Sequence, residues 1–179
     1  LIPPIFSTAF FFNMVHLTNI KNWSLISFTA LFPIYTGMSI LSTLSSGWIL
    51  DKFGVEKVLP FYLLPMTLGL IIFSYGDTYM NAIFGLAFLG MTQGFAMTIG
   101  GTFWPNYYGT KYLGSVRSLS TSTMVFGTAI GPAVVGKLLD FNVSYNVILL
   151  GMSLLGITAS ISLAVTMTQA PKLLPKAKI

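Results

Sequence analysis

Six long apolar stretches, joined by connections of only a few residues, constrain this chain more than any other feature. They run over about 3–20, 24–50, 55–75, 79–103, 114–139 and 143–168. A helix needs about 20 apolar residues to cross the roughly 30 Å hydrocarbon core of a bilayer, and each stretch is close to that length or longer. The pattern therefore predicts an all-α integral membrane protein with six transmembrane helices.

The composition indicates that this chain lies in a lipid bilayer and that nucleic acid is not its partner. Only 7% of its 179 residues are charged and 54% are hydrophobic, whereas roughly 25% of residues are charged in a soluble domain. The net charge of +5 would suggest nucleic acid in a soluble chain, but here the bases fall in short connections and in the tail. In a membrane protein such bases report orientation.

Seven of the nine basic residues fall on one side of the predicted membrane. These seven are Lys52, Lys57, Lys111, Arg117, Lys172, Lys176 and Lys178. Because cytoplasmic loops carry an excess of Lys and Arg, both termini are expected in the cytoplasm, in a plasma or inner membrane. Residues 171–179 then form a basic cytoplasmic tail. The sequence begins without an initiator methionine, so we expect a piece of a longer polypeptide.

The most polar stretch of the chain, from Gly47 to Lys57, joins the second and third apolar runs. Gly47 and Asp51 lie one helical turn apart on the same face, so another backbone can approach beside the carboxylate. Asp51 is at a helix C-terminus, where a negative charge opposes the helix dipole at a cost of about 0.3–1 kcal/mol. We therefore expect Asp51 to have a docking partner, and Gly54 to supply the backbone freedom for the helix end.

The Gly-x-x-x-Asp pattern recurs in the fifth run, at Gly136 and Asp140. Each copy closes the second helix of a three-helix unit, with the units covering about 1–75 and 79–168. Because three is an odd number of crossings, the two copies are expected on opposite faces of the membrane, as in an inverted-topology repeat. The sequence thus predicts two inverted three-helix repeats.

The connection after the second run closely resembles the loop signature of the major facilitator superfamily of secondary transporters. The matching residues are Gly47, Asp51, Lys52, Gly54 and Lys57. In that family the aspartate docks on a helix of the other six-helix half and acts as a cytoplasmic gate. Glu56 departs from the pattern, because family members often carry another base at that position.

The run from Trp104 to Asp140 adds to the resemblance. Trp104-Pro105-Asn106, the stretch 114–117 and the bend-forming pair Gly131-Pro132 look like helices ten and eleven of bacterial members. With the short tail after the sixth run, the resemblance implies the C-terminal half of such a transporter, a six-helix bundle over 1–170. It also implies an N-terminal six-helix half of the same polypeptide as partner, and no cofactor.

Polar residues inside the apolar runs are costly in lipid and become candidates for a substrate site. The first and fourth runs resemble the cavity-lining helices seven and ten. Asn13 and His16 are three residues apart and share a helix face, and a histidine can titrate near neutral pH or donate a hydrogen bond to an anionic substrate. Gln93 in the fourth run and Tyr35 in the second complete the set. For each of these residues, helix packing or an interfacial hydrogen bond is the competing interpretation.

Arg117, which opens the fifth run, and Asp140, which closes it, are predicted gate or interface residues. A guanidinium can bind a carboxylate with two hydrogen bonds, but the position of Arg117 favours a gate or a phospholipid contact. No acid lies deep in any run, and the chain has no cysteine, so we predict no metal site. We also find no nucleophile elbow and no zinc-protease motif, which argues against an enzyme.

The prediction is therefore a membrane transporter of a small solute that works by alternating access together with its other half. His16, Arg117 and the lack of acids within the runs favour a small organic anion as substrate. The alternative is a six-span membrane protein that does not transport, such as an assembly factor or a sensor. The upstream sequence separates the two, because a second six-span unit with its own Gly-x-x-x-Asp loop supports a transporter.

Overall fold

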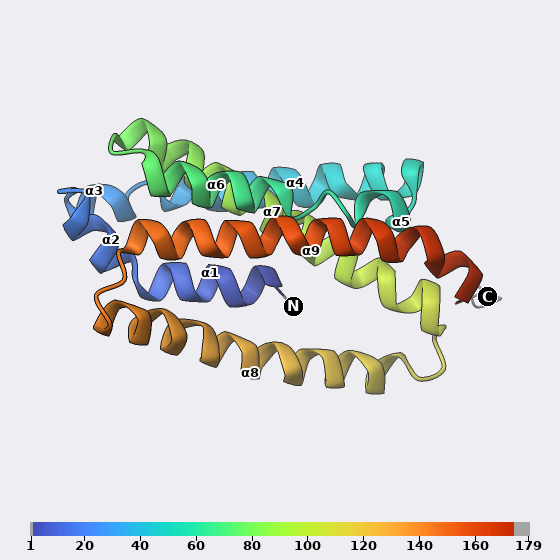
Figure 1. Cartoon of the computed structure of the whole chain (residues 1–179). Helices are drawn as coiled ribbons and strands as arrows, with labels where there is room; N and C mark the ends of the chain where they lie inside the picture. Colours follow the sequence, from blue (N-terminus) through green and yellow to red (C-terminus); the bar gives the residue numbers. More distant parts are fainter. Residues whose placement is uncertain (1, 174–179) are drawn as a thin grey trace.

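A computed structural model describes residues 2–173, and every regular element within that range is an α-helix (Figure 1). The helices are α1 (Ile2–Phe12), α2 (Met14–Ile20), α3 (Leu25–Thr29), α4 (Phe32–Phe53), α5 (Val55–Val58), α6 (Leu64–Tyr75), α7 (Tyr79–Tyr108), α8 (Leu113–Asp140) and α9 (Tyr145–Leu173). The predicted all-α class is thus confirmed. Residues 174–179 of the predicted basic tail lie outside the described residues.

Four helical stretches are long and apolar enough to cross a bilayer. They are Leu25–Phe53, Tyr79–Tyr108, Leu113–Asp140 and Tyr145–Met167. The helices Ile2–Phe12 and Leu64–Tyr75 are also apolar but shorter. A helical membrane protein with several spans is therefore confirmed, whereas six full-length spans are not.

Local breaks explain why the first and third predicted runs do not form single helices. The first run is interrupted at Asn13, whose ψ of 14° departs from helical geometry. The third is interrupted by turns over 59–63. Pro60 lies within these turns, and proline lacks the amide hydrogen that a continuous helix would use.

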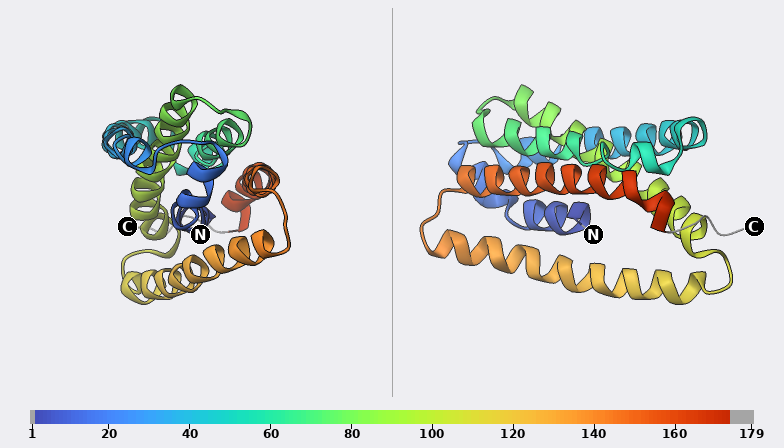
Figure 2. Two further views of the ribbon diagram at one scale, coloured as in Figure 1. Left: turned by 90° about the vertical axis from the view of Figure 1, so that its left-hand side faces the viewer. Right: turned by 45° about the vertical axis from the view of Figure 1, so that its right-hand side comes forward.

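The connections alternate between the two ends of the bundle (Figure 1). The segments 21–24, 76–78 and 141–144 lie at one end, whereas Gly54, the segment 109–112 and the end of α9 lie at the other (Figures 1 and 2). Helix α1 begins partway along the bundle. This alternation is what successive membrane crossings require, and we refer to the two ends as the connection end and the hinge end.

Two connections at the connection end have the same local structure. Asn22 and Asn142 both take left-handed backbone conformations, with φ of 54° and 59°. In both, the next residue's amide donates to the carbonyl five residues before it, at 2.9 Å after Asn22 and 3.1 Å after Asn142. Asparagine tolerates this conformation better than most residues, so these positions end α2 and α8 sharply.

Glycines bring α7 against α4. A Cβ atom at Gly90 would collide with the backbone carbonyl of Tyr35, and one at Gly94 with that of Ser39. Spacing of four residues places the two glycines on one face of α7, which is the small-residue packing known from membrane helices. Gly90 and Gly94 therefore allow α4 and α7 to approach closely.

Helix α8 uses the same device against α1. A Cβ atom at Gly127 would lie 2.6 Å from Cδ1 of Ile5, and one at Gly131 would lie 2.9 Å from the Ile5 carbonyl oxygen. Helix α6 packs between α7 and α9. The apolar core that results is centred on Phe10 and Phe73, whose rings are 4.7 Å apart.

Candidate functional site

Tyr35 and Gln93, two of the four candidate substrate residues, line one hollow between α4 and α7. We call it the polar groove, and its volume is about 440 Å³. Its remaining lining residues are Thr36, Ser39, Ile40, Thr43, Leu44 and Met97. The fold thus brings together two residues that are far apart in the sequence.

The polar groove offers uncharged hydrogen-bonding groups. The hydroxyl of Thr43 donates to the carbonyl of Ser39 at 2.8 Å, and that of Thr36 to the carbonyl of Phe32 at 3.3 Å. Because each hydroxyl proton is used on its own helix, the oxygen lone pairs are left as acceptors. The Gln93 amide makes no hydrogen bond within the described residues, so it can both donate to and accept from a solute.

Asn13 and His16 do not join the polar groove. The amide of Asn13 donates to the carbonyl of Ala9 at 2.8 Å, at the break between α1 and α2. The His16 side chain is exposed, and its ring lies 5.6 Å from that of Tyr145 in an edge-to-face arrangement. Both residues are therefore engaged in local contacts, and their role in binding a substrate stays a prediction.

The connection between α4 and α5 has the local structure that its sequence indicates. Gly54 has a φ of 82°, which favours glycine, and its amide donates to the carbonyl of Leu50 at 2.9 Å. Asp51 and Lys52 are exposed in the last turn of α4, and Lys57 is exposed in α5. The acid and both bases are thus exposed within a few residues of the turn at Gly54.

The face beside Asp51 is open. A Cβ atom added at Gly47 would have no neighbouring atom within 4 Å. The ammonium of Lys52 lies 4.9 Å from the ring of Trp48, and Glu56 accepts a hydrogen bond of 3.2 Å from the Tyr107 hydroxyl. Glu56 thus joins the hinge to the end of α7 at the position where the resemblance suggested another base.

The second copy of the pattern has the same surroundings at the other end of the bundle. A Cβ at Gly136 would also have no atom within 4 Å, and Asp140 is exposed at the end of α8. Arg117 is exposed near the start of α8. It cannot contact Asp140, because that residue lies at the other end of the same helix. Helix α8 is continuous through Pro132, so the predicted bend at Gly131 and Pro132 does not break the helix.

A comparison with protein families decides what kind of protein contains these features. Residues 4–178 match the family model of the Major Facilitator Superfamily. This chain belongs to the Major Facilitator Superfamily. It is therefore a membrane transporter protein in the general sense of that superfamily. No curated protein and no solved structure gives a significant match.

Sequence reasoning missed one polar cluster of this superfamily member, at the connection end. The Lys21 ammonium lies 2.7 Å from a carboxylate oxygen of Asp77 and 3.2 Å from the carbonyl of Ser74. The Trp23 indole N–H donates to the Asp77 carbonyl at 2.8 Å. Opposite charges in two short connections on the same predicted side were the signal that could have revealed this pair.

The described residues offer no metal site. Within residues 2–173, no three His, Asp or Glu side chains are grouped so that they could hold a metal ion. The candidate site offers the hydrogen-bonding groups of the polar groove, and the helix ends offer charges.

Proposed function

We propose that this chain is the C-terminal six-helix half of a secondary transporter, which moves a small solute by alternating access with an N-terminal half of the same polypeptide. The polar groove carries the proposal. Tyr35 and Gln93 place uncharged hydrogen-bonding groups on two of the helices long enough to span a bilayer, where polar groups are costly unless they serve a function.

The packing of the helices supports two inverted repeats within a six-helix half. Helix α1 packs on α8, and α4 packs on α7. If the unit at about 1–75 corresponds to the unit at 79–168, α1 corresponds to α7 and α4 to α8. Exchanging the units then turns one of these helix pairs into the other, as inverted repeats require.

We propose alternating access because this half forms only one side of a substrate site. A substrate site in such transporters lies at the interface between repeated units, and the polar groove forms one wall of such a site. The open face at Gly47 and Asp51 supplies a contact surface for the other half at the hinge end. The lipid bilayer surrounds the remaining helices.

For the substrate we propose a small organic anion. The acids of the described residues, Asp51, Glu56, Asp77 and Asp140, lie in connections or in the first or last turn of a helix. Arg117 offers a cation and His16 a hydrogen-bond donor, while the polar groove suits the uncharged part of a solute. This distribution disfavours an organic cation.

Uptake into vesicles that contain the full-length protein tests the proposal. Labelled monocarboxylates should accumulate more than lipophilic cations, and Gln93→Ala or Tyr35→Phe should reduce uptake at unchanged abundance of the protein in the membrane. Substitution of Met80, which is exposed on α7 outside the groove, by Ala is the matched control. If Gln93→Ala transports normally, the polar groove is only a packing feature; if no solute is moved, the assembly-factor or sensor alternative is favoured.

A further inference from the structure

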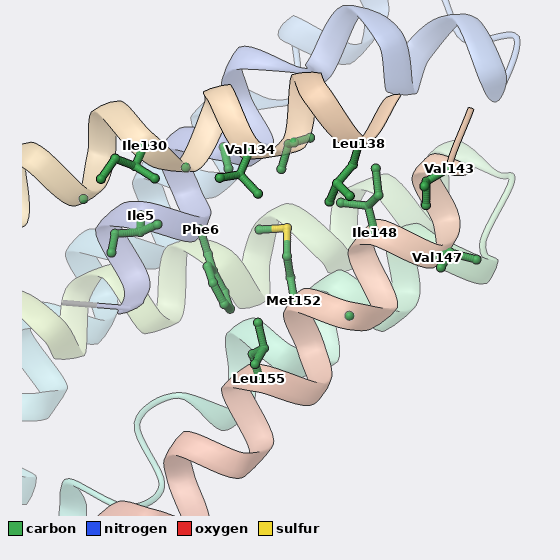
Figure 3. A pocket seen from close by; sticks show the side chains of 15 residues that line it. Ile5, Phe6, Ile130, Val134, Leu138, Val143, Val147, Ile148, Met152 and Leu155 are labelled. Atoms are coloured by element: carbon green, nitrogen blue, oxygen red, sulfur yellow. The ribbon is translucent and has the colours of Figure 1, made fainter. Parts of the chain in front are cut away.

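An apolar groove opens between α8 and α9, with α1 beside it (Figure 3). Its volume is about 650 Å³. The side chains that line it, such as Phe6, Val134, Ile148, Met152 and Leu155, are all apolar. Helix α8 packs mainly on α1, and the ribbons of α8 and α9 diverge from their shared connection (Figure 2). We call this feature the lateral groove.

The length and place of the lateral groove match one leaflet of a bilayer. Its lining runs from Leu138 back to Gly127 on α8, and from Val143, just before α9, to Leu155 on α9. At 1.5 Å per residue these stretches are about 16–18 Å long, and one leaflet contributes about 15 Å of hydrocarbon. Because the groove begins where two membrane-spanning helices end, it extends from the membrane surface to about the middle of the bilayer.

The lining of the lateral groove suits an alkyl chain, because it offers no polar side chain along its length. Lipid tails are as apolar as leucine side chains, so a chain from the surrounding bilayer fills such a space without loss of favourable contacts.

A lysine lies one residue from the lining of the lateral groove, near its surface end. Lys137 is exposed, precedes the groove residue Leu138, and holds its ammonium 6.0 Å from the ring of Phe141. Asp140 is exposed nearby, whereas Lys21 at the same end is already paired with Asp77. Lys137 is therefore the ammonium group that can meet a phosphate at this mouth.

We propose that the lateral groove binds one phospholipid of the leaflet at the connection end. One acyl chain lies between α8 and α9 against Phe6 and Met152, and the phosphate lies beside Lys137. The phospholipid fills the space that α8 and α9 leave between them, and it fixes the distance between these two helices.

Gly151→Phe is the variant that tests the proposal. Gly151 lines the lateral groove, and a Cβ atom there meets nothing within 4 Å, so a side chain at this position starts in open space and we expect its phenyl ring to fill the groove. The matched control is Gly114→Phe. A Cβ atom at Gly114 is also in open space, but this glycine is near the start of α8 and outside the groove.

Native mass spectrometry of the full-length protein, purified in mild detergent after reconstitution with phosphatidylglycerol and phosphatidylcholine, supplies the readout. The wild type and Gly114→Phe should retain one phospholipid that Gly151→Phe lacks. Lys137→Gln should lower the retained phosphatidylglycerol several-fold. Equal retention by all variants, or a second protein chain in place of the lipid, would overturn the proposal.

The position of the phospholipid within the groove is tested with vesicles of phosphatidylglycerol in which one acyl chain carries a terminal diazirine. Photolabelling of the wild type should concentrate on Ile130 and Met152, which line the deeper part of the groove, and it should disappear there in Gly151→Phe. The exposed residues Phe126 and Ile161, which lie outside the groove, report ordinary contact with bulk lipid. Labelling of these two as strongly as Met152 would show that the groove holds no lipid of its own.

Discussion

The ammonium of Lys21 and the carboxylate of Asp77 meet at 2.7 Å although they belong to connections 56 residues apart in the chain. The lysine side chain is only 3% exposed, whereas that of Asp77 is 77% exposed. Together they form an ion pair. It joins the connection between α2 and α3 to that between α6 and α7, so it fixes the connection end of the bundle.

Loss of Asp77 should destabilise the protein. Asp77→Ala leaves the buried Lys21 ammonium with the Ser74 carbonyl as its remaining partner, and a hydrogen bond to a charged group contributes about 1.5–3 kcal/mol. We expect a lower melting temperature in thermal unfolding followed by circular dichroism in detergent. Lys57→Ala, at an exposed lysine of the hinge end, is the control. Identical unfolding of Asp77→Ala and wild type would show that the pair contributes nothing.

Gly90→Ala should weaken the packing of α4 on α7. The new methyl group collides with the Tyr35 carbonyl, and overpacking of this kind costs about 1–3 kcal/mol. Gly101→Ala in the same helix is the control, because a Cβ atom at Gly101 meets no atom within 4 Å. Thermal unfolding should separate the two variants, with Gly101→Ala at or above wild type; the opposite order would contradict the close approach of these helices.

Asp51→Asn and Gly47→Leu should both favour the form that is open to the cytoplasm. We expect Asp51 to dock on the other half only while the cytoplasmic side is closed. Loss of about 1.4 kcal/mol of docking free energy then changes the ratio of the closed to the open form tenfold. Leucine at Gly47 blocks the approach but fits into this half, since nothing lies within 4 Å. A cysteine at the exposed Leu119 should then react faster with a thiol reagent, and net transport should fall.

Gly37→Leu is the matched control for the gate. Gly37 is in the same helix, also with open space at its Cβ position, but it lies away from the hinge. It should leave the reactivity at Leu119 unchanged. Normal transport and unchanged accessibility in both Asp51→Asn and Gly47→Leu would show that these are ordinary residues of a connection.

The membrane orientation can be tested directly because the chain has no cysteine. Single cysteines at Lys57 and Lys111 should resist an impermeant thiol reagent added outside the cell, whereas one at Phe141 should react. Thr78, which is exposed beside Asp77, serves as a second outside position that keeps the ion pair intact. The reverse pattern would show that the hinge end faces outward.

Features that depend on near neighbours in the sequence were predictable. The end of α4 at Gly54 and the packing face of Gly90 and Gly94 follow from the conformational freedom and small size of glycine. The ion pair between Lys21 and Asp77 was not found from hydrophobic periodicity. That periodicity indicates which residues share a helix face, but it does not indicate which connections between helices meet.

The candidate site, too, was predictable only in part. Tyr35 and Gln93 were selected as polar residues within apolar runs, and the fold places them in one groove. Asn13 was expected to share a helix face with His16, but the chain leaves helical geometry at Asn13 itself. A face defined by regular helical spacing fails where the backbone leaves helical geometry, as it does at Asn13.

Helix α4 carries both the wall of the polar groove and the exposed acid of the hinge. It is continuous from Phe32 to Phe53, so Tyr35 and Asp51 are about 24 Å apart along one uninterrupted helix. A tilt of about 5° with Asp51 as the fixed point displaces Tyr35 by about 2 Å over that length. The helix thus acts as a lever arm, and a solute that holds Tyr35 in place also restricts where the hinge can move.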